Sequence, residues 1–283
     1  MSYKTQNARQ SRLFGGSAPW GELLAAAEEQ AAPTRPEADM FDLAREIGLQ
    51  SGHVALDVGS YGGRHAIPLA AEFGCHSIAL DLVLGGLADA RPAIVAAGVE
   101  GRVSLVQADA HEIPLRSASI DLIWSYDMVN CVEPVRLFAE CDRILTPGGS
   151  MVLHMVHFSE LMEPKERERL STALSLTDGC DRNRAEHAIE EVGLSVVKRL
   201  EVGASWVEAG LLEGSSSLAD DLLTVMRMRR GAEALISQFG QLWFETILNS
   251  YQWATLTALG KLEVTLYLLR KSSEVQQSVA NGE

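Results

Sequence analysis

The sequence has few basic residues for its length. Of its 283 residues, 24 are Lys or Arg and 38 are Asp or Glu, which gives a formal net charge of −14. Binding a phosphate backbone requires clustered basic side chains that release its counterions, so no nucleic-acid partner is expected. The dense basic run at 227–230 is short, and we interpret it as the solvated face of a helix.

The sequence also lacks a long apolar run and paired cysteines. No stretch approaches the roughly 18 consecutive apolar residues of a membrane span, and residues 1–20 lack the basic and apolar segments of a signal peptide. A chain of this size can fold without disulfides. We therefore expect no membrane partner, a cytoplasmic location and reduced thiols at Cys75, Cys131, Cys141 and Cys180, which form no C-x-x-C pair.

The chain does contain a regular alternation of short apolar runs and helix-like segments. This alternation predicts an α/β fold with parallel strands joined by right-handed crossovers. A sixth strand at 194–202 and a last strand at 262–270 are separated by about sixty residues of mostly helical pattern. The earlier strands are expected at 54–60, 76–82, 103–110, 121–129 and 150–158, with helices at 65–74, 87–98 and 135–145.

These elements divide the chain into four parts. Residues 1–48 are expected to form a leader with lid helices, and 273–283 a flexible tail. The sheet and its helices occupy 49–202 and 262–272. Segment 203–261 is expected to form a helical substrate cap over the ligand edge of the sheet.

Three acids fall at the ends of three successive predicted strands. Asp57 begins the turn D-V-G-S-Y-G-G at 57–63, whose glycines allow backbone N–H groups to approach a ligand. Asp81 can accept both hydroxyls of a ribose, and Asp109 can accept a hydrogen bond from an adenine amino group. Any one of these features also occurs as a simple cap or turn, but together they predict a site for an adenosyl group.

From Val54 to Phe158, and more loosely to Lys271, the sequence resembles the class I S-adenosylmethionine (SAM)-dependent methyltransferases. The glycine turn, D-L-I-W-S-Y-D-M-V at 121–129 and L-T-P-G-G at 145–149 carry the resemblance. It implies a Rossmann-like seven-stranded sheet with helices on both faces, a helical cap inserted between the last two strands, and SAM as cofactor. It also implies a cofactor site made of Asp57, Gly59, Ser60, Gly62 and Gly63 at the methionine end, Asp81 at the ribose, Leu82, Asp109, Ala110 and His111 at the adenine, and Tyr126 near the methyl group.

One position departs from the usual loop of this family. Tyr61 stands where a glycine is common. A bulky residue at a point of close backbone approach must either adopt an unusual dihedral angle or shift the loop. The geometry of the cofactor site is therefore expected to differ locally.

Candidate catalytic residues follow the fourth and fifth strands. Methyl transfer is an in-line displacement dominated by alignment, and a base is needed only if the acceptor must lose a proton. Asp127, His154 and His157 are the candidates, with a helix cap and two core histidines as the structural alternatives. The odd spacing of the histidines places them on opposite faces of the strand. We favour His157 because it ends the strand, and the spacing does not indicate a metal site.

The acceptor is expected to be a small molecule. Asn130 follows the fourth strand, and segment 203–261 concentrates aromatic side chains with polar groups, as small-molecule pockets do. Trp206, Tyr251 and Trp253 are the candidate substrate contacts, although they could equally hold the cap to the sheet.

The cap resembles those of bacterial natural-product methyltransferases, which implies a hydroxyl or amine of a secondary metabolite as acceptor. C- or S-methylation, a SAM-fold protein without methyl transfer, and a nicotinamide oxidoreductase remain alternatives. The oligomeric state stays open between a monomer and a homodimer.

Overall fold

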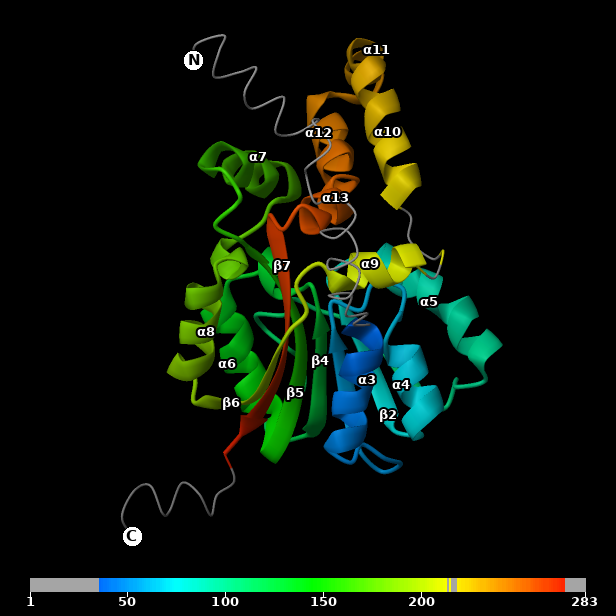
Figure 1. The fold of residues 1–283 in the computed structure, drawn as a ribbon. Helices are drawn as coiled ribbons and strands as arrows, with labels where there is room; N and C mark the ends of the chain where they lie inside the picture. The colour runs from blue at the N-terminus through cyan, green and yellow to red at the C-terminus, as the bar shows by residue number, and fades with distance from the viewer. Residues whose placement is uncertain (1–35, 213, 215–217, 273–283) are drawn as a thin grey trace. The chain divides into compact units, whose positions relative to one another are not determined.

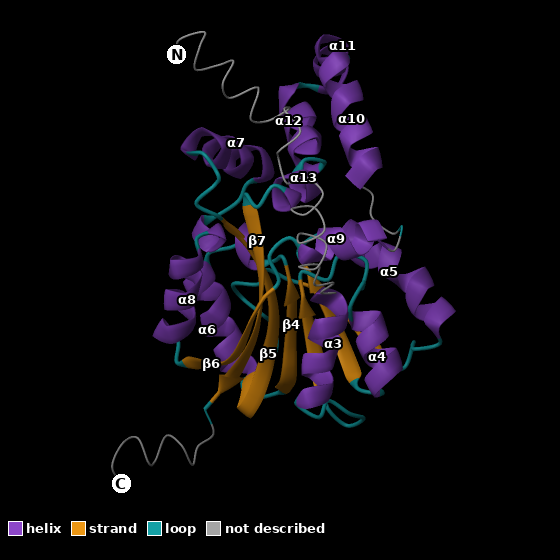
Figure 2. Cartoon of the chain, viewed as in Figure 1, coloured by secondary structure: helices purple, strands orange, loops and turns teal. Residues whose placement is uncertain are grey.

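A computed structural model describes residues 36–212, 214 and 218–272, and these residues form a seven-stranded sheet flanked by helices (Figure 2). The strand order is β3-β2-β1-β4-β5-β7-β6, in which β7 alone runs antiparallel to both of its neighbours. The first five strands are parallel, as predicted. The strands are β1 (Val54–Val58), β2 (His76–Asp81), β3 (Val103–Gln107), β4 (Ile120–Tyr126), β5 (Leu145–Phe158), β6 (Leu194–Glu201) and β7 (Leu262–Lys271).

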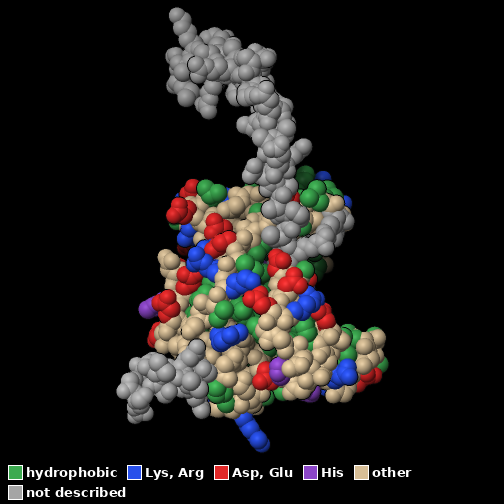
Figure 3. Space-filling model, turned by 60° about the horizontal axis from the view of Figure 1, so that its bottom comes forward, with side chains coloured by type: hydrophobic (Ala, Val, Ile, Leu, Met, Phe, Trp, Pro, Cys, Tyr) green, Lys and Arg blue, Asp and Glu red, His purple; other side chains and the backbone are tan. Residues whose placement is uncertain are grey.

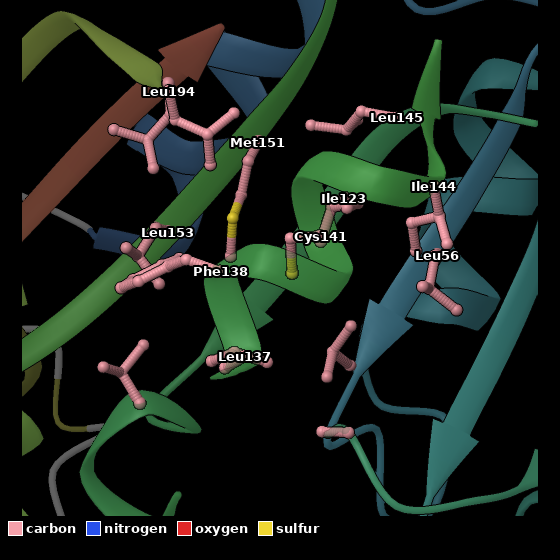
Figure 4. Close-up of a cluster of buried hydrophobic side chains, with 14 of the residues drawn as sticks. Leu56, Ile123, Leu137, Phe138, Cys141, Ile144, Leu145, Met151, Leu153 and Leu194 are labelled. Atoms are coloured by element: carbon pink, nitrogen blue, oxygen red, sulfur yellow. The ribbon is translucent and has the colours of Figure 1, made fainter. Parts of the chain in front are cut away.

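Helices cover both faces of this sheet (Figure 1). On one face, Leu56 and Ile123 pack against helix α6, and Figure 4 shows the side chains Leu137, Phe138 and Cys141 of that helix within the same cluster. The helices on this face are α6 (Pro134–Ile144) and α8 (Arg182–Glu191), and those on the other face are α3 (Pro36–Glu46), α4 (Ala66–Phe73) and α5 (Leu84–Ala97).

Local chemistry explains where helix α6 begins and which face it buries. The carboxylate of Glu133 accepts the backbone N–H groups of Val135 and Arg136, and Pro134 occupies the first helical position. Leu137, Cys141 and Ile144 then recur at helical spacing and are fully buried. Because strands alternate their side chains between faces, this stripe packs against the residues of one face of the sheet.

Several predicted boundaries differ from the structure, and two of the differences concern the third and fifth strands. The third strand was expected to reach residue 110 but ends at Gln107. The carboxylate of Asp109 accepts the backbone N–H of His111, which turns the chain out of the sheet. The fifth strand, expected to begin at residue 150, begins at Leu145, so the L-T-P-G-G segment forms its irregular start, where the register against β4 shifts between Ile120 and Leu122.

The segment between β6 and β7 is helical in its described part, as predicted. It contains a small core of its own, formed by Val225, Phe244 and Leu248. Its helices are α9 (Ser205–Leu212), α10 (Leu218–Arg230), α11 (Ala232–Phe239), α12 (Gln241–Ser250) and α13 (Trp253–Ala258), and three further elements precede it: η1 (Val129–Cys131), α7 (Pro164–Leu174) and η2 (Asp178–Cys180).

The expected leader, the first lid helix and the C-terminal tail lie outside the described residues. Among the helices that are described, none is both long and apolar enough to cross a membrane.

Candidate functional site

The glycine turn lies between β1 and α4 and is fastened at both ends. The side chain of Asp57 is buried, and its Oδ2 accepts the backbone N–H of Ala66 at 3.0 Å. Burial raises the pKa of Asp57 to about 6. Gly59 and Gly63 have φ angles of 79° and 74°, which only glycine adopts readily. The turn thus has positive φ angles at two of its glycines, and the Asp57 carboxylate stabilises it by accepting the N–H of Ala66, the first residue of α4.

Tyr61 adopts the unusual dihedral that its bulk required. Its φ is 44°, and its side chain is 62% exposed. The ring lies over the backbone of Gly86 in α5, where a methyl group added to Gly86 would come within 2.7 Å of Cδ2 of the ring. Gly86 therefore supplies the space that the tyrosine needs.

The carboxylate of Asp81 connects this turn to the end of β2. Its Oδ2 accepts the backbone N–H of Tyr61 at 2.7 Å, and its Oδ1 accepts that of Val83 at 2.8 Å. Each carboxylate oxygen can accept a second hydrogen bond, so both can also receive a ribose hydroxyl. Leu82 beside it is exposed, which leaves an apolar surface for a base.

The loop after β3 holds three of the four predicted adenine residues. Asp109 Oδ1 accepts the backbone N–H of His111 and lies 2.9 Å from Nδ1 of the same residue. The hydrogen bond from the backbone of His111 lowers the pKa of Asp109. Nε2 of His111 lies 3.0 Å from the backbone nitrogen of Glu133, and Ala110 is buried beneath. His111 therefore connects the loop after β3 to the start of α6.

A stack of three rings lies at the end of β4, where Tyr126 is paired with His154 of β5. The ring of Tyr126 is 4.0 Å from that of His154 and 4.9 Å from that of His65, both nearly parallel to it. The guanidinium of Arg64 lies 5.6 Å from the centre of the Tyr126 ring. Burial raises the pKa of Tyr126, so its hydroxyl stays protonated.

Asp127 and His154 form a pair beside this stack. Nδ1 of His154 lies 2.9 Å from Oδ1 of Asp127, and the backbone N–H of Asp127 donates to the carbonyl oxygen of His154. The side chain of His154 is 4% exposed and that of Asp127 is 35% exposed. Asp127 has a φ of 55°, a strained value for a non-glycine residue. Its carboxylate bonds His154 instead of capping a helix, which was the structural alternative.

Sequence reasoning missed the other end of the stack. Glu37 in α3 lies 3.2 Å from Nε2 of His65 and also pairs with Arg64. The hydrogen bond from His65 lowers the pKa of Glu37. The only available signal was the Arg-His sequence directly after the glycine turn. It carried no indication that a carboxylate from 28 residues earlier would meet it.

His157 lies away from this group. As predicted, it faces the opposite side of β5 from His154: its ring meets the edge of Tyr267, on the α6 and α8 face. Burial lowers the pKa of His157 to about 4. Neither ring nitrogen has a hydrogen-bond partner in the described chain. The geometry favours His154 over His157 as the histidine of the site.

The predicted substrate residues are not equally placed. Trp206 of α9 and Trp253 of α13 pack against the buried cluster on the face of the sheet that also holds Trp124 and Tyr126. Asn130 in η1 is buried, and its Oδ1 has no partner in the described chain. Tyr251 is exposed at the end of α12 and belongs to none of the described core clusters.

The part of the chain that contains most of this site is similar to a known protein family. Residues 56–153 match the family model described as a methyltransferase domain. The chain carries a methyltransferase domain. The match confirms the predicted resemblance to methyltransferases, and the seven-stranded sheet confirms the predicted fold.

Two curated relatives match part of the domain. Dimethylglycine N-methyltransferase from Parasynechococcus marenigrum (strain WH8102) is 28% identical over 102 residues, which are 29% of this chain and 36% of that protein. Methyltransferase GfsG from Streptomyces halstedii is 31% identical over 112 residues, which are 39% of this chain and 40% of that protein. The methyltransferase domain thus aligns with less than half the length of either relative.

A solved structure extends the likeness of fold to most of the chain. Geranyl diphosphate C-methyltransferase from Streptomyces coelicolor A3(2), with Mg²⁺, geranyl-S-thiolodiphosphate and S-adenosylhomocysteine, has a TM-score of 0.63 at 13% identity. The match covers 83% of this chain and 76% of that one. At this identity the likeness concerns the fold alone.

Proposed function

We propose that this protein transfers a methyl group from SAM to a hydroxyl or amine of a small molecule. The proposal depends chiefly on one observation. Asp57, Asp81 and Asp109 lie at or just beyond the carboxyl ends of three adjacent parallel strands, beside a turn whose Gly59 and Gly63 have positive φ angles. Open α/β sheets bind their ligands at this edge.

The residues present fit the cofactor. Asp81 would hold the ribose hydroxyls, Leu82 would contact the adenine, and Asp109 would accept the adenine amino group. The Ser60 hydroxyl in the glycine turn is buried and has no hydrogen-bond partner in the described chain, as expected of a group that forms its hydrogen bond with a bound ligand. Bound SAM supplies an electrophilic methyl group on its sulfonium.

The Asp127 and His154 pair is our candidate for the acceptor's proton. Asp127 is the more accessible member, so its carboxylate would face the acceptor while His154 fixes its orientation. Tyr126 and the apolar walls from Trp206 and Trp253 would exclude water around that position. A thioether acceptor would need this pair less than a hydroxyl would, because its sulfur carries no proton to lose.

Small molecules suit this chain better than nucleic acids do. Figure 3 shows acidic and basic side chains interspersed on the face that it presents, with no broad basic area among the described residues there. The net charge of −14 also opposes a polyanion. A cytoplasmic location stays a prediction from the sequence.

Calorimetry with SAM and S-adenosylhomocysteine tests the cofactor site. Asp81→Ala should weaken binding by about 1–3 kcal/mol, because two charge-assisted hydrogen bonds to the ribose are lost. Asp89→Ala, an exposed acid on α5, is the matched control. Absence of heat with both ligands would refute the proposal.

The transfer itself is tested with methyl-labelled SAM and a panel of hydroxyl, amine, thiol and carbon acceptors. Label in a hydroxyl or amine product supports the proposal. Label confined to carbon or sulfur products would reject the acceptor class, and cofactor binding without any labelled product would reject methyl transfer.

A further inference from the structure

Helix α10 exposes an apolar stripe. Leu222, Leu223 and Met226 are 41%, 45% and 63% exposed. Their spacing of three and four residues places them on one face of the helix. The opposite face is used within the chain, because Val225 is buried against Phe244. In Figure 1, α10 lies beside α12 in the helical segment between β6 and β7.

The charges of α10 are separated by sign along the helix. Acids occupy the first turn at Asp220 and Asp221, and arginines occupy the last turn at Arg227, Arg229 and Arg230. Asp220 and Arg227 are seven residues apart, which is close to two full turns. Both therefore lie on the same flank of the apolar stripe.

This pattern is self-complementary. A two-fold axis that pairs two copies of α10 reverses the helix direction and brings the same flank of each copy together. Asp220 of one copy then faces Arg227 of the other, and the symmetry forms this pair twice. The midpoint between Asp220 and Arg227 falls beside Leu223, so the apolar stripe would meet its own copy at the axis.

We propose that the outer face of α10 binds a second copy of this chain in an antiparallel, two-fold arrangement. An anionic lipid surface would attract the arginines but repel the acids at the other end, whereas a second copy satisfies both. A single pair of helices is a small interface, so we expect a dimer with a Kd of about micromolar. This inference does not depend on the proposed function.

Sedimentation equilibrium of the full chain tests the proposal. Leu223→Glu should abolish the dimer, because it places two like charges at the axis. Asp220→Arg and Arg227→Asp should each weaken the dimer about tenfold or more, and the double variant Asp220→Arg/Arg227→Asp should restore it. Glu233→Lys on α11 reverses an exposed charge outside the stripe and should leave the dimer unchanged.

Three results would overturn the proposal. These are a wild-type chain that stays monomeric up to about 100 µM, far above the expected Kd, a dimer that survives Leu223→Glu, and a double variant that dimerises no better than the single ones. Co-sedimentation of a monomeric chain with anionic vesicles would replace the second copy with a membrane surface. Circular dichroism confirms that each variant is folded.

Discussion

The backbone N–H of Glu133 donates to Nε2 of His111 at 3.0 Å. In the neutral ring, that acceptor role places the proton on Nδ1, which faces Asp109 at 2.9 Å. One side chain thus contacts both the Asp109 carboxylate and the start of α6.

His111→Ala should lower the free energy of unfolding by about 1–3 kcal/mol, because the part-buried N–H of Glu133 loses its acceptor. His111→Gln keeps an acceptor near the Nε2 position and should recover part of this loss, whereas His111→Asn keeps only a donor toward Asp109 and should not. Urea unfolding measures all three variants. Equal stability of the Gln and Asn variants would contradict the bridging role.

Gly86 and Tyr61 should be energetically coupled. In the wild-type chain, Gly86→Ala places a methyl group against the tyrosine ring, so it should destabilise the protein by about 1–3 kcal/mol. In the Tyr61→Gly background the same change should be neutral or stabilising by up to about 1 kcal/mol, because alanine favours a helix. A double-mutant cycle from thermal or urea unfolding measures the coupling. Additive effects would show that the ring does not depend on Gly86.

Ionisation of Asp57 should cost stability. Its pKa is raised from 3.8 to about 6 in the folded chain, so the folded state binds the proton more tightly than the unfolded state does. Its contribution is fully present below pH 4 and is lost as the pH rises to 6.

Relative to Asp57→Asn, the wild type should therefore lose about 1–3 kcal/mol between pH 4 and pH 6 and change little above. Asparagine can still accept the N–H of Ala66 through its side-chain oxygen, so it serves as the uncharged control. Urea unfolding of both chains across this pH range gives the difference. Parallel stability curves would mean that Asp57 titrates normally.

The two histidines of β5 should separate cleanly in activity. His154→Ala should reduce kcat by about tenfold to a thousandfold and leave the affinity for S-adenosylhomocysteine unchanged, because the Asp127 carboxylate loses the partner that orients it. His157→Met should leave kcat unchanged and should not reduce stability, since it removes two unpartnered buried nitrogens. Steady-state kinetics with an acceptor identified from the panel measures both. A low kcat for His157→Met together with a normal kcat for His154→Ala would instead support His157 as the catalytic histidine, as its place at the end of the strand predicted.

The sequence predicted the fold well because each parallel strand is a short apolar run bounded by turn residues. The same regularity placed Asp57, Asp81 and Asp109 at one edge, since neighbouring parallel strands finish together. The preference for His157 came from treating the end of a strand as the open end. β5 continues past the end of β4, so its last residues are covered, and His154 is the residue level with Tyr126.

Side-chain pairs across the fold could not be read from the sequence. The pairing of Asp127 with His154 depends on the register between two strands, and the contact of Glu37 with His65 depends on how α3 lies against the sheet. Neither contact produces a periodic pattern in the sequence from which it could be predicted. The space over Gly86 that accommodates Tyr61 likewise appears only when α5 is packed.

The position of Glu37 in the first turn of α3 has a wider consequence. Its carboxylate contacts His65, the first ring of the three-ring stack whose other end lies beside Asp127. A helix that takes no part in the strand pairing therefore stabilises this stack. If residues 1–37 were removed, every strand would remain, but we expect a low kcat, because the stacked rings would lose the carboxylate that contacts His65.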